Sequence, residues 1–238
     1  MATNDFYSGE APQNYQQKCA VVFVMDVSGS MGATIEGKIP IDELNKGLQS
    51  FQQEIQNDSV ASERLDIALV SFGSEAKVEH DFELVQDYQM PTLGLQGSTN
   101  LVDGMRKGME ILEERKKWYR ETKQTYYRPY IILITDGYPD VNPSSCGLTA
   151  ELKQAVNDKK FNFWPIGVEG ADMQMLNDMA SPGVGACLPG LKLDGLKFVE
   201  LFQWLSSSFS KLSNSSDNEK QDLQPEADKN PFMVTVTA

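Results

Sequence analysis

The stretch VVFVMDVSGSMG places an aspartate and two serines directly after a run of apolar residues. Asp26, Ser28 and Ser30 alternate along the chain, so in an extended or turning segment their side chains project to a common side. A carboxylate and two hydroxyls at the end of a strand suit a nucleophile, a phosphate cradle or a metal site. Residues elsewhere in the chain must distinguish these three chemistries.

A second aspartate, Asp136, ends another apolar run, IILITD. The segment LQGSTNLVDGM adds Ser98 and Thr99 immediately before a predicted helix, and Gly97 allows the backbone to approach a site closely. In an open parallel sheet, ligands bind beyond the carboxyl ends of the strands, where the strand order reverses. If the two apolar runs are neighbours in the sheet, the carboxylates of Asp26 and Asp136 converge there.

Two carboxylates and three hydroxyls would then gather, those of Asp26, Ser28, Ser30, Thr99 and Asp136. An oxygen-only set with two charges suits a hard divalent cation such as Mg²⁺, with Mn²⁺ or Ca²⁺ as alternatives. Taken singly, each residue is more often a helix or turn cap, and Thr99 is a good N-cap candidate for the helix that follows. The combination of the three segments favours the metal site.

The elements that must position these residues alternate between short apolar runs and longer amphipathic ones. This alternation is typical of an α/β fold with a parallel sheet and helices on both faces. The predicted strands span residues 20–26, 64–72, 76–82, 130–136, 162–168 and a short segment near 185–190. The predicted helices span residues 40–57, 101–122, 146–160, 172–180 and 196–212.

Only three residues, GSE, separate the runs RLDIALVSF and AKVEHDF, which is too few for a crossover connection. These two strands must therefore form an antiparallel hairpin. The alternating polar residues of AKVEHDF fit an edge strand better than a central one.

Length and composition fit one domain. Of the 238 residues, 40% are hydrophobic and 23% are charged, enough for one well-buried domain of about 200 residues. We assign residues 18–213 to this domain and residues 1–17 to an N-terminal arm. Residues 214–230 are polar, lack aromatic residues and include both Ser and Pro, so we predict that 214–238 form a disordered acidic tail. Its β-prone end, FMVTVTA, is either a frayed terminus or a strand that adds to a sheet edge or a partner groove.

The overall charge and the cysteines narrow the class of protein. The formal charge of −13 argues against nucleic acid as a partner, because a phosphate backbone is bound by clustered Lys and Arg. Cys19, Cys146 and Cys187 are widely spaced and include no CxxC pair, as is typical of reduced thiols. No leader-like segment opens the sequence, and no window approaches the roughly 20 apolar residues of a membrane span. We therefore expect a soluble, cytoplasmic protein that binds neither nucleic acid nor a membrane.

Catalytic interpretations of the same residues have less support. The only histidine, His80, lies on the predicted edge strand, so a Ser-His-Asp triad lacks its base. A Mg²⁺-dependent phosphatase or phosphotransferase with Asp26 as nucleophile is the alternative, although the three segments offer neither an obvious general acid nor a phosphate-binding cation. A purely structural cation site also stays open. We expect no enzymatic activity.

D-V-S-G-S-M at 26–31, G-S-T-N at 97–100 and T-D-G at 135–137 resemble the metal-ion-dependent adhesion site of von Willebrand factor A domains. The five metal-ligand positions of that motif fall, without departure, on Asp26, Ser28, Ser30, Thr99 and Asp136. The resemblance implies a doubly wound, mostly parallel six-strand sheet with one antiparallel edge strand. It also implies a non-enzymatic role, in which a carboxylate from a partner protein completes the coordination of the metal.

Further patterns resemble the bacterial TerY-type proteins associated with tellurium-resistance gene clusters. They are ELNKGLQSF, ITDGYPD, IGVEGADMQML and LDGLKFVELFQWLSSSFSKLS. The resemblance spans about residues 18–213 and implies a stress-response or defence setting. By resemblance alone, a protein kinase and a PP2C-type phosphatase of the same system are candidate partners.

Residues around the metal would set which partner binds. Neutral hydroxyl ligands leave the cation more attractive to an incoming anion than extra carboxylates would, so the expected partner offers an Asp or Glu. The predicted rim consists of Gly29, Met31, Gly32, Asn100, Tyr138, Pro139 and Asp140. Tyr138 and Met31 are candidate exposed anchors of the kind enriched at interfaces, with local packing of the loops as the alternative.

Overall fold

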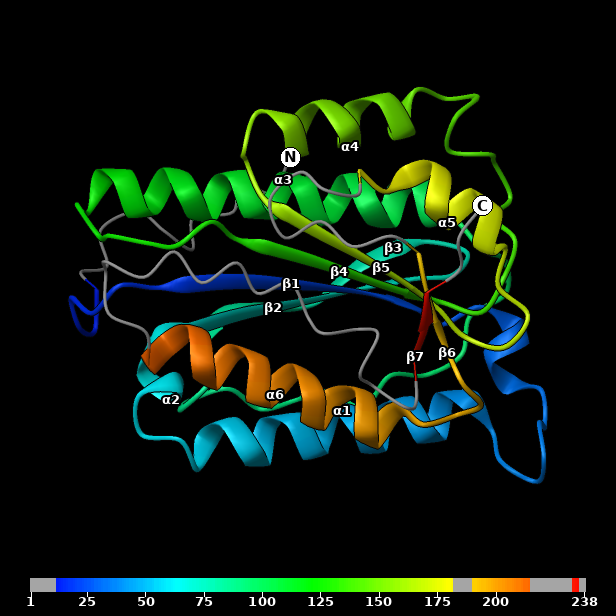
Figure 1. Ribbon diagram of the computed structural model, residues 1–238, viewed down its shortest axis with the longest axis horizontal. Coiled ribbons are helices and arrows are strands. Elements are labelled where there is room, and N and C mark those ends of the chain that lie inside the picture. The colour runs from blue at the N-terminus through cyan, green and yellow to red at the C-terminus, as the bar shows by residue number, and fades with distance from the viewer. Residues whose placement is uncertain (1–11, 182–189, 215–232, 236–238) are drawn as a thin grey trace.

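A mixed β-sheet forms the middle layer of the protein in the computed structural model, which describes residues 12–181, 190–214 and 233–235. Its strands are β1 (Cys19–Asp26), β2 (Leu65–Phe72), β3 (Ala76–Leu84), β4 (Tyr130–Thr135), β5 (Asn162–Gly167), β6 (Leu191–Leu193) and β7 (Met233–Thr235). Their order across the sheet is β3-β2-β1-β4-β5-β6-β7. One face is covered by α3 (Leu101–Glu121), α4 (Leu148–Asn157) and α5 (Met173–Met179), and the other by α1 (Pro40–Gln56), α2 (Ala61–Arg64) and α6 (Phe198–Asn214) (Figure 1).

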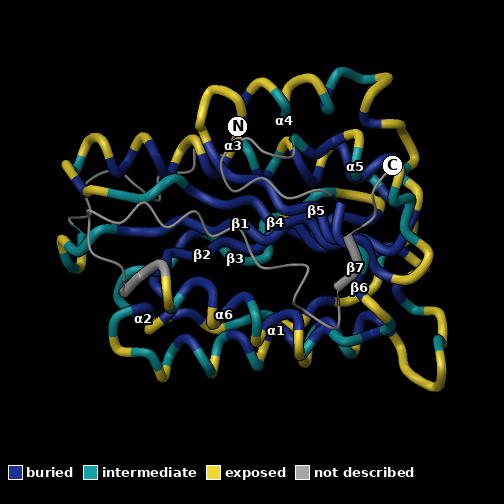
Figure 2. The backbone as a smooth tube through the Cα atoms, viewed as in Figure 1, coloured by how far each residue is buried: buried dark blue, intermediate teal, exposed yellow. Residues whose placement is uncertain are grey.

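Strand β1 shows why the centre of the sheet is apolar on both faces. Val21, Phe23 and Met25 belong to the buried cluster that includes α1 and α6, whereas Val22 and Val24 belong to the cluster that includes α3 and α4. Because successive side chains of a strand point to opposite faces, a strand covered on both sides needs an uninterrupted apolar run. The strand is buried along its whole length (Figure 2).

Two glycines bring the start of α3 close to the sheet. A methyl group on Gly104 would lie 2.7 Å from Phe72 Cβ, and one on Gly108 would lie 2.9 Å from Val24 Cγ2. Both distances are shorter than the roughly 3.5 Å at which carbon atoms pack, so only glycine permits this approach. Because Thr99 lies two residues before α3, the close contact holds the Thr99 segment near the ends of β1 and β2.

A buried ion pair holds the other end of α3. Arg115 Nε lies 2.6 Å from Asp66 Oδ2 in β2, and the Tyr119 hydroxyl donates to the same carboxylate oxygen. These contacts lie at the amino ends of the parallel strands, away from the segments that carry the predicted ligands. Helix α3 is therefore anchored to the sheet at both of its ends.

The expected strands are present, with β3 antiparallel to β2 at one edge, as the short GSE connection predicted. The short strand expected near 185–190 falls mainly on residues 182–189, outside the described residues, and the described sixth strand is Leu191–Leu193. Strand β7 pairs antiparallel with β6, so the prediction of a single antiparallel edge strand was incomplete. Residues 233–235 thus follow the sheet-edge alternative, while the rest of the predicted tail, 215–232 and 236–238, lies outside the described residues.

The predicted helices are all present, with bounds that differ by a few residues, and the short helix α2 was not predicted. Within the described ranges, no helix is both long and apolar enough to cross a membrane. The proposed domain boundaries, after residues 17 and 213, stay predictions.

Candidate metal site

Three loops that carry the predicted ligands meet at the carboxyl ends of the parallel strands. They are the first loop (residues 27–32), the second loop (residues 94–100) and the third loop (residues 136–141). Strands β1 and β4 are adjacent and parallel, so Asp26 at the end of β1 and Asp136 directly after β4 lie at the same edge. The strand order reverses between β1 and β4, which is where open sheets bind ligands. The two carboxylates converge as the sequence predicted.

A chain of hydrogen bonds connects the first loop to the third. Ser28 Oγ lies 3.0 Å from Ser30 Oγ, and the Ser30 hydroxyl donates to Asp136 Oδ1 at 2.7 Å. The Ser28 backbone N–H donates to Asp26 Oδ1 at 2.8 Å. A single 3₁₀ turn, Gly29–Gly32, begins directly after Ser28 and bends the chain away from the strand direction. Both serines are therefore held beside the aspartates.

Thr99 joins this group from the second loop. A methyl group on Gly137 would lie 3.5 Å from Ser30 Oγ and 3.7 Å from Thr99 Oγ1, so both hydroxyls flank the same glycine. The N-cap of α3 is Asn100, whose side chain accepts a hydrogen bond from the Asp103 N–H. The alternative role for Thr99, capping this helix, is thus taken by its neighbour. Four of the five predicted ligand residues thus lie on loops that contact one another, and the fifth, Asp26, ends β1 directly before the first loop.

The two carboxyl groups are buried without a basic neighbour. Asp26 is 0% exposed and Asp136 is 5% exposed, and no ion pair within the described part of the chain includes either. Burial raises the pKa of Asp26, against hydrogen bonds from Ser28 and Thr135 that favour the ionised form. Burial also raises the pKa of Asp136 to about 6, opposed by the Ser30 hydrogen bond and assisted by the charge of Asp26. A bound cation would relieve this unfavourable burial of charge.

The donor set fits a hard divalent cation. It consists of two carboxylates and three neutral hydroxyls, all of them oxygen ligands, and Ser30 is exposed, so the site opens to solvent. In the described ranges no three His, Cys, Asp or Glu side chains gather as a metal cluster. A cation held here would therefore depend on the hydroxyl oxygens as well as the carboxylates, a combination that suits Mg²⁺ with some retained water.

Thr135 is a site residue that the sequence interpretation missed. Its hydroxyl donates to Asp26 Oδ2 at 2.5 Å, and the Gly137 N–H donates to Thr135 Oγ1 at 3.3 Å. The last residue of β4 therefore orients the carboxylate at the end of β1. The feature of the sequence that could have identified it is the T-D-G motif, of which Thr135 is the first residue.

Ser74 supports the second loop and had no signal in the sequence. Its Oγ accepts hydrogen bonds from the backbone N–H groups of residues 97 and 98, at 3.1 and 3.2 Å. The Gly29 N–H donates to Gly97 O at 3.0 Å, which joins the first loop to the second. The second loop is thus held from the β2–β3 turn on one side and from the first loop on the other.

The family model of the von Willebrand factor type A domain matches residues 20–188, which is well over half of the chain. The chain belongs to this family. No curated protein is similar enough in sequence to be matched.

The chain is similar in fold to several solved structures. The pilus adhesin SpaC from Lactobacillus rhamnosus GG has 16% identity and a TM-score of 0.64, with 85% of this chain and 32% of that chain covered. The PilB minor pilin from Streptococcus sanguinis has 16% identity and a TM-score of 0.55, covering 85% and 62%. The ArnB paralog VWA2 from Sulfolobus acidocaldarius has 17% identity and a TM-score of 0.50, covering 83% and 46%. The present chain spans less than two thirds of the length of each, and at these identities the likeness concerns the fold alone.

The predicted rim of this von Willebrand factor type A domain is only partly exposed. Met31 is fully buried in the cluster that includes α1, so the prediction that it is an exposed anchor was wrong and local packing is its role. Tyr138 is 69% exposed, as an anchor requires. Of the remaining rim residues, Gly29 and Asp140 are exposed, and Gly32, Asn100 and Pro139 are half-buried.

Asp140, a predicted rim residue, also joins two of the loops. The Thr99 N–H donates to Asp140 Oδ1 at 3.1 Å, and the Asp140 N–H donates to Thr99 O at 3.0 Å. These two bonds join the second loop to the third beside the candidate ligands. Asp140 therefore positions Thr99, which the sequence interpretation did not foresee.

Proposed function

We propose that this von Willebrand factor type A domain binds a divalent cation and uses it to hold an Asp or Glu of a partner protein. The ligands in this proposal are Asp26, Ser28, Ser30, Thr99 and Asp136, with Mg²⁺ as the first choice and Mn²⁺ or Ca²⁺ as alternatives. The observation that carries the proposal is the convergence of two buried carboxylates and three hydroxyls without a basic neighbour among the described residues. When bound, the cation would supply a local positive charge on an acidic protein, to which a partner's carboxylate can bind.

A binding role has more support than catalysis. In the phosphatase alternative Asp26 is the nucleophile, yet it is fully buried, and its two oxygens accept hydrogen bonds from the Ser28 N–H and the Thr135 hydroxyl. Phosphoryl transfer would also need a basic side chain to position the phosphate, and in the described part of the chain no ion pair brings one to Asp26 or Asp136. One of the similar structures is described as a pilus adhesin, which also supports binding. The proposal is therefore a non-enzymatic interaction module.

The cellular setting in this proposal is a cytoplasmic bacterial stress response of the tellurium-resistance type. Its support is the sequence resemblance of segments such as ITDGYPD and IGVEGADMQML to TerY-type proteins. A protein kinase or a PP2C-type phosphatase of the same system is the candidate partner that would offer the acidic residue.

Calorimetry of cation uptake tests the proposal. Mg²⁺, Mn²⁺ and Ca²⁺ are titrated into EDTA-stripped wild type, Asp26→Ala and, as a matched control, Asp158→Ala, which alters an exposed carboxylate at the end of α4. Uptake is expected in wild type and the control and lost in Asp26→Ala, which should still fold because removing a buried charge relieves repulsion. Absence of uptake in the wild type would refute the cation site.

A pull-down with each candidate partner, with and without EDTA, tests the second half of the proposal. Release of the partner by EDTA is expected if the cation bridges the two proteins. Cation uptake combined with a partner that EDTA does not release would instead make the ion structural and place the partner surface elsewhere.

A further inference from the structure

Large apolar side chains gather on the loops around the candidate metal site. The large apolar residues that are most exposed in the described part of the chain are Tyr15, Ile39, Leu95, Tyr138 and Val141. Three of them, Leu95, Tyr138 and Val141, come from the second and third loops and are 50%, 69% and 49% exposed. Isolated exposed apolar residues are ordinary, whereas several on adjoining loops indicate an interaction surface.

Leu95 rests on the first loop. The neighbouring Gln96 N–H donates to Val27 O at 2.6 Å, which fixes the backbone of the second loop at this point. A methyl group on Gly32 would lie 2.6 Å from Leu95 Cδ1, so this side chain lies directly against the glycine while half of it faces solvent. A side chain held in this way loses little conformational entropy when a partner covers it.

Tyr138 and Val141 lie on either side of the bonds between Thr99 and Asp140. Because those two bonds fix the third loop to the second, the backbone that carries both apolar side chains is held in place. Tyr138 directly follows Gly137, which lies against Ser30 and Thr99. The exposed apolar residues therefore adjoin the candidate ligands on a fixed backbone.

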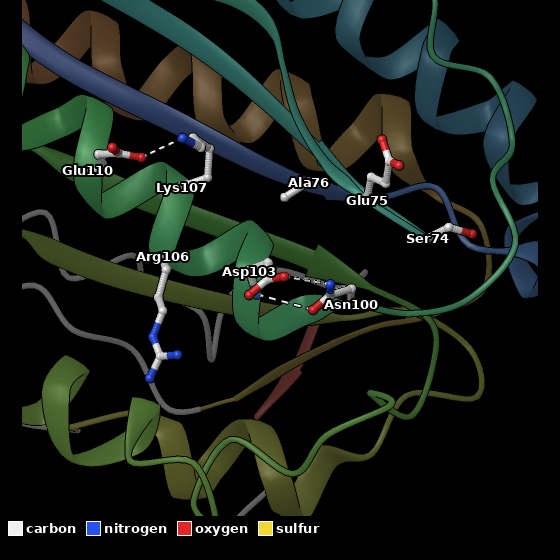
Figure 3. Close-up of a pocket in the computed structure, with 8 residues that line it drawn as sticks. All are labelled: Ser74, Glu75, Ala76, Asn100, Asp103, Arg106, Lys107 and Glu110. Atoms are coloured by element: carbon white, nitrogen blue, oxygen red, sulfur yellow. Dashed lines mark hydrogen bonds and ion pairs between the residues drawn. The ribbon is translucent and has the colours of Figure 1, made fainter. Parts of the chain in front are cut away.

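The polar recess beside the second loop does not favour a partner segment that carries a further acidic residue beside the one bound to the cation. It lies between the β2–β3 turn and the start of α3 (Figure 3). Its two basic residues are already paired, Arg106 with Glu151 at 2.9 Å and Lys107 with Glu110 at 2.5 Å. Its lining contains three acidic residues against these two basic ones, and the chain as a whole carries −13. A partner segment with several carboxylates would be repelled here, whereas one carboxylate among apolar residues would not.

We infer that Leu95, Tyr138 and Val141 form an apolar rim that selects a protein segment in which a single Asp or Glu is flanked by large apolar residues. This inference rests on the proposed function, because the cation holds the carboxylate and the apolar rim distinguishes one carboxylate-bearing segment from another. A tyrosine that acts as a hot spot of an interface changes affinity by about tenfold or more.

Two labelled peptides test the selection by fluorescence anisotropy with the full chain in Mg²⁺. In one peptide a single Asp is flanked by Leu and Phe, and in the other by two Ser residues. The first is expected to bind about tenfold more tightly, and EDTA should release it. Tyr138→Ser should abolish this preference. Tyr15→Ser is the matched control, because Tyr15 is 70% exposed but precedes the amino end of β1, away from the candidate metal site. This variant should keep the preference for the first peptide.

Calorimetry of Mg²⁺ uptake on the same samples distinguishes failure of the apolar rim from failure of the cation site. Intact Mg²⁺ uptake with equal affinity for both peptides would overturn the apolar rim and leave the cation site standing. The apolar rim would also be overturned if Tyr138→Ser preferred the first peptide as strongly as Tyr15→Ser does. It would likewise be overturned if the Mg²⁺-loaded chain bound neither peptide with a Kd below about 1 mM. Absence of cation uptake would refute the proposed function itself, and the apolar rim with it.

Discussion

Asp136→Asn in the cation-free protein tests the electrostatics of the site directly. Burial raises the pKa of Asp136 from 3.8 to about 6, so the folded protein binds this proton more tightly than the unfolded chain does. Between these two values the folded state holds more protons than the unfolded state, so its stability falls as the pH rises. Above pH 6 the folded protein carries the full cost of a buried, ionised carboxylate. Below pH 4 that cost disappears.

The size of the effect follows from the pKa difference. About 2 pKa units at 1.36 kcal/mol each give an upper limit of about 3 kcal/mol. Water reaches the site through the exposed Ser30, and screening by this water lowers the expected value to about 1 to 2 kcal/mol. Asparagine cannot ionise, yet it keeps a carbonyl oxygen for the Ser30 hydroxyl that now donates to Asp136. In EDTA at pH 7, the free energy of unfolding of Asp136→Asn should therefore exceed that of wild type by about 1 to 2 kcal/mol.

Urea unfolding followed by circular dichroism at several pH values between 4 and 7 measures this difference. In EDTA the advantage of Asp136→Asn should grow with pH, and the exposed control Asp158→Asn should match wild type at every pH. In Mg²⁺ the order should reverse, because a ligand that binds only the folded state stabilises wild type and the variant lacks a ligand group. A variant that is less stable than wild type at pH 7 in EDTA would refute the reasoning.

Three further substitutions test contacts around the site and away from it. Thr135→Val leaves a buried oxygen of Asp26 without its donor, so urea unfolding should show a loss of about 1 to 3 kcal/mol; an unchanged midpoint would contradict that contact. Asp140→Ala releases the Thr99 backbone and should weaken Mg²⁺ binding about tenfold in calorimetry, as loss of a ligand-orienting contact commonly does; affinity equal to wild type would argue against a positioning role. Arg115→Met breaks the buried ion pair at the other edge of the sheet and should cost about 3 to 5 kcal/mol in urea unfolding; a loss below 1 kcal/mol would show that this pair does not anchor α3.

The central strands could be predicted from the sequence because both of their faces are buried. The β4 segment YIILIT is apolar nearly throughout, and every residue in it is buried. The far edge of the sheet gave no comparable pattern. Strand β6 has three residues and pairs with β5 at only two positions, Ile166↔Leu191 and Gly167↔Lys192, which is too short for a periodic signal. The pairing of β7 with β6 is a long-range contact that no local pattern encodes.

Each candidate ligand could be predicted because it lies in a recognisable motif at the end of an apolar run. The supporting contacts were not predictable in the same way. Asp140 reaches the Thr99 backbone across 41 positions of sequence, and Ser74 reaches the second loop from a hairpin turn. Met31 was misassigned because an apolar residue in a polar loop can point either way, and the 3₁₀ turn that directs it inward is not visible in residue types.

The hydrogen bonds of the site connect parts of the chain that are far apart in sequence. Ser30 and Asp136 are 106 positions apart, and Asp26 and Thr135 are 109 positions apart. Closing loops of this length is entropically unfavourable until β1 and β4 have paired within the sheet. An unfolded or truncated chain that lacks this pairing cannot assemble the five oxygens, whatever the cation concentration. Cation-dependent capture would thus be confined to molecules that have completed folding, and a partner that depends on the cation would ignore nascent or damaged copies.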